Sequence, residues 1–428
     1  MKRTINIGII GFGNIGSSVA KNLKKNSAIV SDRVGAAVKV VAASDKSAKA
    51  LTLAKKMGIK ALKNPNDIVR DPGIDIVLEA MGGENSAKKV ILDAIKRGKH
   101  VVTSNKEVIA KHIAEILAAA NKMGVSVSFE AAVGGATPII SPLRDELSGN
   151  DISQVYGIVN GTTNYILSMM TDHGMQFNEA LASAMAAGYA ERNPASDIEG
   201  IDSAYKSAII ATVAFGADID WGNIYVEGIS HITQVDIQFA REIGYVIKLL
   251  AVVKKAKGSL EVRVHPMLIP QDHQLASVSG NLNAIYIKGS PAGNILLSAA
   301  GAGGDPTSSA VMGDIIGIAA RIIRGDSPVS WRPLKKFKLS DIEAIRSRYY
   351  IRLTAPDKFG VLAGISKAFA DAKVSIQAVV QKETVGGSAT IVILIHEVLE
   401  KNLIRAVAKI RKLSVVKEIN NVIRVASE

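Results

Sequence analysis

Short apolar runs alternate with longer amphipathic stretches over the first third of the chain. The apolar runs that predict strands are residues 4–10, 39–43, 75–80, 100–103 and 125–129. The stretches with helical periodicity start at Ser17 and then span residues 48–57, 86–97 and 107–123. Strands that alternate with helices predict a doubly wound parallel sheet, and such sheets bind ligands beyond the carboxyl ends of their strands.

The order of elements changes after residue 135. Strand patterns at 154–160, 249–253, 261–266 and 284–287 mix with helical patterns at 178–187 and about 306–324. Residues 349–426 then predict the order strand, helix, strand, glycine turn, strand, helix and strand, which is the ferredoxin-like βαββαβ arrangement. The predicted class is α/β, with a Rossmann-type doubly wound sheet at 1–135, an α+β substrate-binding and dimerisation domain at 136–328, a linker at 329–348 and a ferredoxin-like domain at 349–428.

Composition removes several classes of protein. The 428 residues are 48% hydrophobic, which suits compact domains, and no run reaches the ~20 apolar residues that a transmembrane helix needs. The N-terminus is too short and too glycine-rich for a signal peptide. The absence of cysteine excludes disulfides, thiolate metal sites and a cysteine nucleophile, so a cytoplasmic location is the default expectation.

A net charge of +13 suggests an anionic partner. Aromatic residues make up only 4% of the chain, and no basic stretch is interleaved with them as stacking on nucleic acid requires. Small anionic ligands are therefore favoured over nucleic acid, and no membrane partner is expected.

The motif GFGNIG at residues 11–16 follows the first predicted strand and opens a helix. Gly11 permits the tight turn, Gly13 lets a pyrophosphate approach the backbone, and Gly16 allows close packing of helix on strand. The helix N-terminus adds N–H donors and the positive end of its dipole. This context predicts a dinucleotide site.

The second predicted strand ends in Ser44, Asp45 and Lys46. An acidic residue here would bind the ribose 2′-hydroxyl of NAD, whereas a basic or hydroxyl residue would accept the 2′-phosphate of NADP. Asp45 and Lys46 point to opposite answers, so both cofactors stay open.

Residues 103–106, TSNK, end the fourth predicted strand. Lys106 can hold a phosphate or a substrate carboxylate. The alternative is a surface lysine at a helix start, a position that the helix dipole disfavours.

Two further glycine-rich stretches occur later. EAAVGGATPII at 130–140 offers one carboxylate and exposed carbonyls, a set that suits a monovalent cation, although the local pattern alone favours a plain hinge. SAAGAGGDPT at 298–307 opens a helix and either approaches a cofactor or connects two elements. Between them, Thr162 of GTTNYIL is expected to cap a helix.

The stretch at 189–217 combines acidic residues with a long apolar run. Glu191 and Asp197 lie in its polar first part, and Asp202 and Lys206 follow one helical turn apart on the same face. A carboxylate and an ammonium at the start of an apolar helix are candidates for catalysis. The alternative is an ordinary helical ion pair, worth a few tenths of a kcal/mol.

The loop at 357–360 in the last domain joins a strand to a helix, where backbone N–H groups can bind an amino acid's carboxylate. A role in dimerisation is the alternative and does not exclude the first.

Taken in order, GFGNIG, TSNK, EAAVGGATPII, NGTTNYIL, GYAE, DIEGIDSAYKSAI and GAGGDPTSSAV resemble the homoserine dehydrogenase family, over residues 1 to about 325. The region from about 349 resembles an ACT domain, and the whole resembles the monofunctional form. The resemblance implies reversible NADP- or NAD-dependent interconversion of L-aspartate 4-semialdehyde and L-homoserine, in threonine, methionine and isoleucine biosynthesis. It also implies a homodimer or homotetramer, an amino-acid effector such as threonine at the ACT domain, and a sodium or potassium ion.

The family's functional residues carry over by motif. The resemblance implies catalytic roles for Lys206, Asp202 and Lys106. It implies substrate binding by Glu191, Asp197, Asp202 and Lys206. It implies cofactor contacts at Gly11, Phe12, Gly13, Asn14, Ile15, Gly16, Asp45, Lys46, Thr103, Lys106, Gly188 and Gly303. It implies a cation site at Glu130, Val133, Gly135 and Thr137. The chain departs from the family at Ser104, where alanine is usual.

Elementary chemistry is consistent with these roles. Hydride transfer to an aldehyde creates an alkoxide, which needs a nearby cation and then a proton, and a lysine supplies both. Oxidation of an aldehyde through a thioester would need cysteine, which the chain lacks. The rival hypotheses are another amino-acid dehydrogenase and a non-catalytic sensor with an ACT domain. The sensor would be expected to have lost the lysine, the glycines or the carboxylates, and all are present.

Overall fold

The computed structural model describes residues 4–384 and 387–426. The chain divides into two compact units, each built from separated segments. The first unit contains Met1–Val159, Ala204–Ile224 and Leu282–Phe337. The second contains Asn160–Ser203, Tyr225–Asn281 and Lys338–Glu428. The domain boundaries expected from the sequence therefore differ from the compact units, because both units recruit chain from the middle of the sequence.

A parallel sheet of order β3-β2-β1-β4-β5-β6 organises the first unit. Its strands are β1 (Ile5–Ile10), β2 (Val38–Ser44), β3 (Lys60–Leu62), β4 (Ile76–Glu79), β5 (His100–Thr103) and β6 (Val127–Ser128). The helices between them are α1 (Asn14–Lys25), α2 (Ser27–Val34), α3 (Ala48–Lys56), α4 (Pro65–Arg70), α5 (Asn85–Lys96) and α6 (Lys106–Met123). This is the doubly wound dinucleotide-binding order, so the predicted α/β class is confirmed. The short strand β3 and helix α2 were not expected from the sequence.

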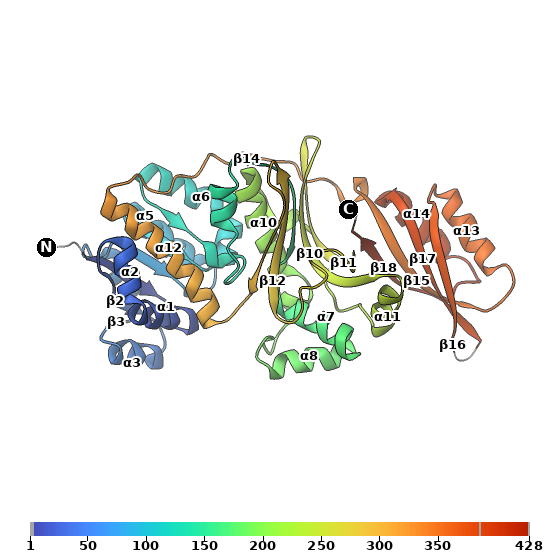
Figure 1. Cartoon of the computed structure of the whole chain (residues 1–428), viewed down its shortest axis with the longest axis horizontal. Coiled ribbons are helices and arrows are strands. Elements are labelled where there is room, and N and C mark those ends of the chain that lie inside the picture. The colour runs from blue at the N-terminus through green and yellow to red at the C-terminus, as the bar shows by residue number, and fades with distance from the viewer. Residues whose placement is uncertain (1–3, 385–386, 427–428) are drawn as a thin grey trace. The chain divides into compact units, whose positions relative to one another are not determined.

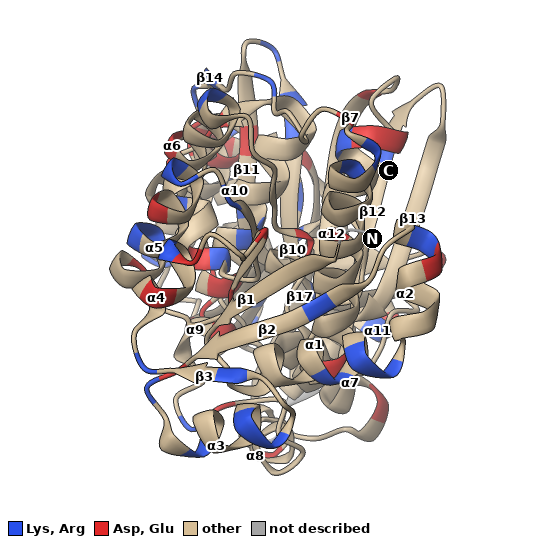
Figure 2. Cartoon of the chain, turned by 90° about the vertical axis from the view of Figure 1, so that its left-hand side faces the viewer, with Lys and Arg blue, Asp and Glu red and all other residues tan. Residues whose placement is uncertain are grey.

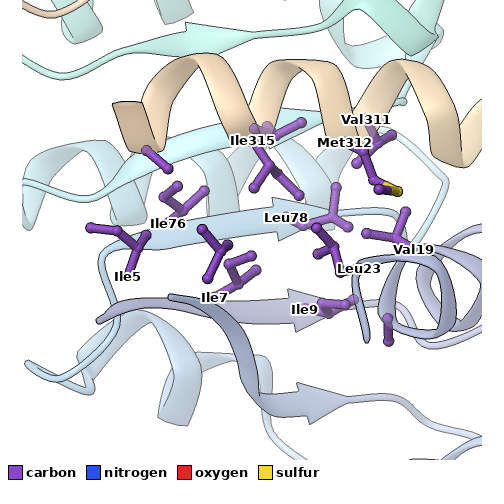
Figure 3. Packing of buried hydrophobic residues seen from close by; sticks show 14 of the residues in the cluster. Ile5, Ile7, Ile9, Val19, Leu23, Ile76, Leu78, Val311, Met312 and Ile315 are labelled. Atoms are coloured by element: carbon purple, nitrogen blue, oxygen red, sulfur yellow. The ribbon is translucent and has the colours of Figure 1, made fainter. Parts of the chain in front are cut away.

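The core of this sheet includes a helix from much later in the chain. Figure 3 shows Ile5, Ile7, Ile9, Ile76 and Leu78 from the strands packed with side chains of α12. Helix α12 (Gly304–Arg324) supplies buried Val311, Met312 and Ile315 to this core. The sequence placed this helix in the middle domain, but its buried face completes the Rossmann-type core. Truncating a fully buried isoleucine such as Ile315 to alanine costs about 2–5 kcal/mol.

The first unit also contains an antiparallel set of strands, with β12 (Leu282–Ser290) pairing both β7 (Asp151–Ile158) and β13 (Gly293–Ala300). Two short strands, β8 (Ala217–Asp218) and β14 (Lys335–Lys336), pair in parallel. The glycine-rich loop expected at 298–307 is shorter than predicted, because β13 extends to Ala300.

The second unit holds the remaining elements. Its helices are α7 (Gly161–His173), α8 (Phe177–Ala186), α9 (Ala195–Ile198), α11 (Gln234–Glu242), α13 (Val361–Asp371) and α14 (Glu400–Ile410). Its strands are β9 (Tyr225–Val226), β10 (Tyr245–Ala256), β11 (Ser259–Pro270), β15 (Arg346–Pro356), β16 (Ile376–Thr384), β17 (Ser388–Leu399) and β18 (Glu418–Val425). Helix α10 (Ile201–Phe215) begins in the second unit and continues into the first.

The last part of the second unit has the order β15-α13-β16-β17-α14-β18, which confirms the βαββαβ prediction (Figure 1). Residues 385–386 of the expected glycine turn lie outside the described residues. Strand β18 also pairs in parallel with β11, so the sheet of this domain continues into β10 and β11.

A buried ion pair fixes α11 on this sheet. Arg352 Nε donates to Asp236 Oδ1 over 2.6 Å, and Asn421 donates to the same carboxylate. Burial would raise the pKa of Asp236, but Arg352 outweighs it and holds the pKa below its ordinary value. Asp236 and Arg352 therefore form a charged, hydrogen-bonded pair within the second unit.

The surface charge of the first unit is mixed. Basic and acidic residues both occur along α4, α5 and α6 (Figure 2), so the net positive charge does not form one basic field over these helices. Among the described residues, no helix is long and apolar enough to cross a membrane.

Candidate active site

The GFGNIG turn has the backbone conformation and the close contacts for which the sequence analysis expected its three glycines. Gly11 has φ +92°, and a Cβ there would lie 2.3 Å from the Ala80 carbonyl oxygen. A Cβ on Gly16 would lie 2.1 Å from the Gly11 oxygen, whereas one on Gly13 would meet no atom within 4 Å. Gly13 is the N-cap of α1 and forms no side-chain cap bond. The turn therefore presents open space and the first N–H groups of α1 to a pyrophosphate.

A cavity of about 590 Å³ lies at the carboxyl ends of β1, β2 and β4. Gly11, Gly13, Asp45 and Lys46 line it, as does Lys63 just beyond β3. The Asp45 carboxylate accepts the Phe12 N–H through one oxygen and the Ser47 N–H through the other, each over 2.7 Å. The Asp45 carboxylate therefore already stabilises the turn through both of its oxygens. The positively charged side chains that line the cavity are those of Lys46 and Lys63.

A second cavity, of about 460 Å³, shares the lining residues 80–83 with the first. Ile15, Lys106, Val133, Gly135 and Lys206 all line it. An extended ligand can run from the first cavity into the second along their common wall. Two sequence-predicted lysines, one hundred positions apart, therefore meet a single cavity beside the glycine motif.

Lys206 lies on α10 with only 8% of its surface exposed. Its Nζ donates to the Val159 carbonyl over 2.6 Å, and that carbonyl also accepts from the Asn283 amide over 3.3 Å. A carbonyl dipole orients the ammonium without neutralising its charge. The Lys206 Nζ is therefore held at the wall of the second cavity.

Lys106 is the first residue of α6, and Asn105 caps that helix by accepting the Val108 N–H over 3.2 Å. The helix dipole disfavours a cation at a helix N-terminus, so Lys106 does not stabilise α6. A binding site that needs a positive charge explains a lysine at this position better. Thr103, just before, is fully buried and donates its hydroxyl to Glu79 over 2.6 Å.

Glu79 ends β4 and is itself completely buried. Burial raises the pKa of this carboxyl, although hydrogen bonds from Thr103 and the Met81 N–H act in the opposite direction. It connects the ends of β4 and β5 at the wall that the two cavities share. Glu79 is therefore a candidate positioning residue, whereas the sequence indicated only a strand at this position.

Two of the predicted substrate-binding acids meet in the second unit. The Asn160 amide donates to Asp197 Oδ1 over 2.7 Å and to Asp202 Oδ2 over 2.9 Å. Asp202 is only 1% exposed.

Asn160 also caps α7 by accepting the Thr163 N–H over 2.8 Å. The cap predicted at Thr162 was therefore wrong, because α7 already includes Thr162, which donates to the Tyr189 carbonyl, and Asn160 takes the N-cap position.

The other predicted residues are more dispersed. Glu191 is exposed in the loop after α8, and Gly188 ends that helix with φ +75°. Gly303 is the N-cap of α12, and a Cβ on the next residue, Gly304, would lie 2.7 Å from Asn14 Oδ1. The start of α12 thus lies against the start of α1, which is where the resemblance expected a cofactor contact.

The predicted cation site is built around a carboxylate that already has partners. Glu130 accepts the N–H groups of Ile139, Ile140 and Ser141 over 2.6–2.8 Å. Its charge also raises the pKa of nearby Asp314 to about 8, after burial of Asp314 as the larger cause. Three of the roughly four lone-pair positions of the carboxylate are used. A cation here would depend mainly on backbone carbonyls.

Sequence reasoning missed three functional candidates: Lys63, Glu79 and Asn160. Each follows or ends a strand, where ligands of such sheets bind, and this position was the available signal. Lys63 was not singled out because the short strand β3 before it was not expected.

The sheet order, the glycine turn and the paired cavities define a dinucleotide-dependent oxidoreductase. Residues 11–130 match the family model for the NAD binding domain of homoserine dehydrogenase, residues 138–316 match that for homoserine dehydrogenase, and residues 349–415 match that for the ACT domain.

Known proteins agree with these matches. The chain is 40% identical to a homoserine dehydrogenase of Synechocystis, covering 99% of this chain and all of the relative. A solved homoserine dehydrogenase from Thiobacillus denitrificans is 41% identical, with a TM-score of 0.94 over 100% of this chain and 99% of that one. A hyperthermophilic archaeal homoserine dehydrogenase mutant in complex with NADPH is 28% identical, with a TM-score of 0.63 over 74% of this chain and 98% of its own. The chain belongs to the homoserine dehydrogenase family, an NAD(P)-dependent oxidoreductase family, and carries a C-terminal ACT domain.

Proposed function

We propose that the chain catalyses the reversible reduction of L-aspartate 4-semialdehyde to L-homoserine, a step of threonine, methionine and isoleucine biosynthesis. The observation that carries this proposal is that Lys106 and Lys206 line one cavity beside the GFGNIG turn. A polarised carbonyl substrate needs such positive charge next to the cofactor.

The nicotinamide supplies or accepts the hydride when it is bound. Lys206 stabilises the developing alkoxide electrostatically and then gives its Nζ proton to that oxygen. In the reverse direction the lysine takes the hydroxyl proton. Val159 holds the ammonium in place for both directions through its carbonyl.

The remaining substrate groups need partners of opposite charge. Lys106 binds the substrate carboxylate, or a cofactor phosphate, from its place at the start of α6. The family resemblance implies substrate binding by Glu191, Asp197 and Asp202, and the carboxylates of Glu191 and Asp202 can bind the substrate ammonium. The amide of Asn160 fixes Asp197 and Asp202 as a pair, which supports a shared role.

NADP is the preferred cofactor in this proposal. Lys46 and Lys63 both line the first cavity, whereas the Asp45 carboxylate is engaged by two backbone N–H groups. Two lysines suit a 2′-phosphate, which carries more charge than a 2′-hydroxyl. The NADPH complex of the archaeal relative is consistent with this preference.

A monovalent cation at Glu130 is a further part of the proposal. The carbonyls of Val133, Gly135 and Thr137 would complete its oxygen ligands, with Glu130 giving its remaining lone-pair position. Replacing sodium and potassium with a bulky organic cation should lower the unfolding temperature. No change in unfolding temperature would count against the site.

Amino-acid control and self-association also belong to the proposal. ACT domains support an effector such as threonine, and exposed strand edges support a homodimer or homotetramer. Light scattering tests the second point, and a monomeric mass would refute it.

The deciding experiment is the initial rate of L-homoserine oxidation at alkaline pH, with NADP and NAD in parallel. A clear rate with NADP, and a lower one with NAD, is the expected result. Absence of a rate with either cofactor, in folded protein that still binds a dinucleotide, would redirect the assignment to another amino-acid dehydrogenase.

A further inference from the structure

Asn283 on β12 is a completely buried asparagine whose amide is only half satisfied. Its Nδ2 donates to the Val159 carbonyl over 3.3 Å, and the residue is 0% exposed. Within residues 4–384 and 387–426, no group donates a hydrogen bond to its Oδ1. A buried acceptor without a donor costs free energy of folding. Stability alone therefore does not explain an asparagine at this position.

The Val159 carbonyl is the group that Asn283 shares with Lys206. The register of β7 with β12 ends where Ile158 lies opposite Ala284, so Val159 comes one residue after the paired strand. Lys206 Nζ donates to the Val159 oxygen over 2.6 Å, and Asn283 Nδ2 donates to the same oxygen. A carbonyl oxygen has two lone pairs, so both donors can bind at once. Two side chains therefore hold this carbonyl where the paired strand no longer does.

The orientation of the Asn283 amide follows from this contact. With its nitrogen toward Val159 the amide donates to the carbonyl, whereas the reverse orientation would bring two oxygens together. The nitrogen is therefore the end that acts on the carbonyl, and the oxygen is the end that lacks a donor.

Gly301 contacts the Asn283 amide from the other side. It follows β13 in the glycine-rich stretch, and it lines the second cavity, as Lys206 does. A Cβ on Gly301 would lie 2.2 Å from Asn283 Oδ1 and 2.6 Å from Nδ2. Gly301 does not have a positive φ, so its backbone conformation does not require glycine. Packing requires it, because any side chain would displace the amide.

The backbone around Gly301 is itself held in place. The Ala136 N–H donates to the Ala300 carbonyl over 3.1 Å. A Cβ on Gly135 would lie 2.3 Å from the Gly301 carbonyl oxygen, so these two backbone segments are in close contact. Gly301 therefore cannot move away from the amide without breaking these contacts. All of these residues belong to the first unit.

We propose that Asn283 is a positioning residue for Lys206, and that Gly301 keeps the Asn283 amide in place. The amide fixes the direction of the Val159 carbonyl, and this carbonyl fixes Nζ at the wall of the second cavity. A reacting group misplaced by about 1 Å can lose about a hundredfold in rate. The inference rests on the proposed function for its kinetic effect, but not for the placement of Nζ.

Asn283→Ala tests the effect of the amide on the reaction. We expect kcat for homoserine oxidation to fall about tenfold or more, while KM for homoserine and Kd for NADP stay within about twofold. Ser298→Ala is the matched control, because it removes the 2.9 Å hydrogen bond from Ser298 to the Asn283 backbone carbonyl and leaves the amide. Its kcat should equal that of the wild type. An unchanged kcat in Asn283→Ala, or an equal loss in Ser298→Ala, would overturn the inference.

Gly301→Ala displaces the amide while the asparagine is still present, so it provides a test even if Asn283→Ala does not fold. At saturating cofactor, kcat should again fall about tenfold. In the double variant the space left by the amide accommodates the new methyl group, so the loss should equal that of Asn283→Ala alone. A loss of about a hundredfold, the product of the two single losses, would show that the two residues act independently and would overturn the inference.

Crystal structures of the variants separate this inference from the proposed reaction. In Asn283→Ala the Val159 carbonyl should turn, and its distance from Lys206 Nζ should exceed about 3.5 Å. In Ser298→Ala both atoms should keep their places. An unmoved Nζ in Asn283→Ala would overturn the inference. A wild-type enzyme without activity on homoserine would refute the proposed reaction and leave this structural test standing.

Discussion

Two buried lysines, one in each unit, occupy similar surroundings. Lys206 is 8% exposed and donates to the Val159 carbonyl over 2.6 Å. Lys248 on β10 is 5% exposed and donates to the Val278 carbonyl over 2.6 Å and to the Asn164 amide oxygen over 3.1 Å. The difference is that a cavity of about 460 Å³ opens beside Lys206, whereas none of the described cavities reaches Lys248.

This comparison separates burial from function. Burial lowers the pKa of Lys248 to about 8, a shift that would attract attention in any search for catalytic groups. None of the cavities described above borders Lys248, so we expect that shift to affect stability and not catalysis. An ammonium becomes a candidate for catalysis when burial and a neighbouring cavity occur together.

The largest expected effect comes from removing Lys206. Lys206→Ala should lower kcat for homoserine oxidation about a thousandfold or more, because the alkoxide loses both its charge partner and its proton donor. Binding of the dinucleotide, measured by fluorescence, should change little. Lys248→Met should keep kcat within about threefold. Equal losses of kcat in the two variants would contradict the view that only Lys206 takes part in catalysis.

The lowered pKa of Lys248 should be detectable in the pH dependence of the free energy of unfolding. Its folded pKa of about 8 lies below its ordinary value of 10.5, so the unfolded chain binds more protons between these values and stability rises with pH. The full shift corresponds to about 3 kcal/mol. Urea unfolding of wild type and Lys248→Met should show the wild type gaining relative stability from pH 8 to 10.5.

A matched control for this titration is Lys257→Met, which removes an exposed lysine just after β10. Its stability difference from wild type should be flat over the same pH range. A flat difference for Lys248→Met as well would mean that the buried lysine does not titrate with a lowered pKa.

A smaller effect is expected for cofactor choice. Lys63→Ala should raise KM for NADP about tenfold and leave KM for NAD unchanged, because the lost contact is to the 2′-phosphate. Lys60→Ala, an exposed lysine on β3 that does not line the cavity, is the control. Parallel changes for both cofactors would assign Lys63 to the general electrostatics of the site.

The smallest effect should come from Asn160→Ser. Serine still caps α7, but the amide bonds to Asp197 and Asp202 are lost, so KM for homoserine should rise a few-fold with kcat nearly constant. Asn164→Ser alters the partner of Lys248 and should leave KM unchanged. A fall in kcat with constant KM would place Asn160 in the chemical step instead.

Local pattern was sufficient for much of the fold. The parallel strands, the glycine turn and the βαββαβ order were predictable because each depends on short-range periodicity and turn chemistry. Strand β3 has three residues, too few to show a period, and Lys63 was missed with it.

Long-range assembly was not predictable in the same way. No local feature of α12 indicates that Val311 and Ile315 pack on β1 and β4. For the site, residue types predicted Lys106 and Lys206 separately, but their common cavity depends on the tertiary fold. The Asn160 bridge was missed because residue 160 was expected to end a strand, and its contacts with Asp197 and Asp202 join residues about forty positions apart.

The late position of α12 has a consequence for synthesis on the ribosome. The chain emerges from its N-terminus, so β1, β2 and β4 are made long before the helix that covers their apolar side chains. Helices α1 and α2 contribute to the same core, but the part of the sheet that α12 covers stays exposed until residues 304–324 are translated. A gene fragment that stops at the expected boundary of 135 would leave the part of the core normally covered by α12 exposed, and exposed apolar surface favours aggregation. Expression of an isolated cofactor domain would need α12 appended through a designed connection.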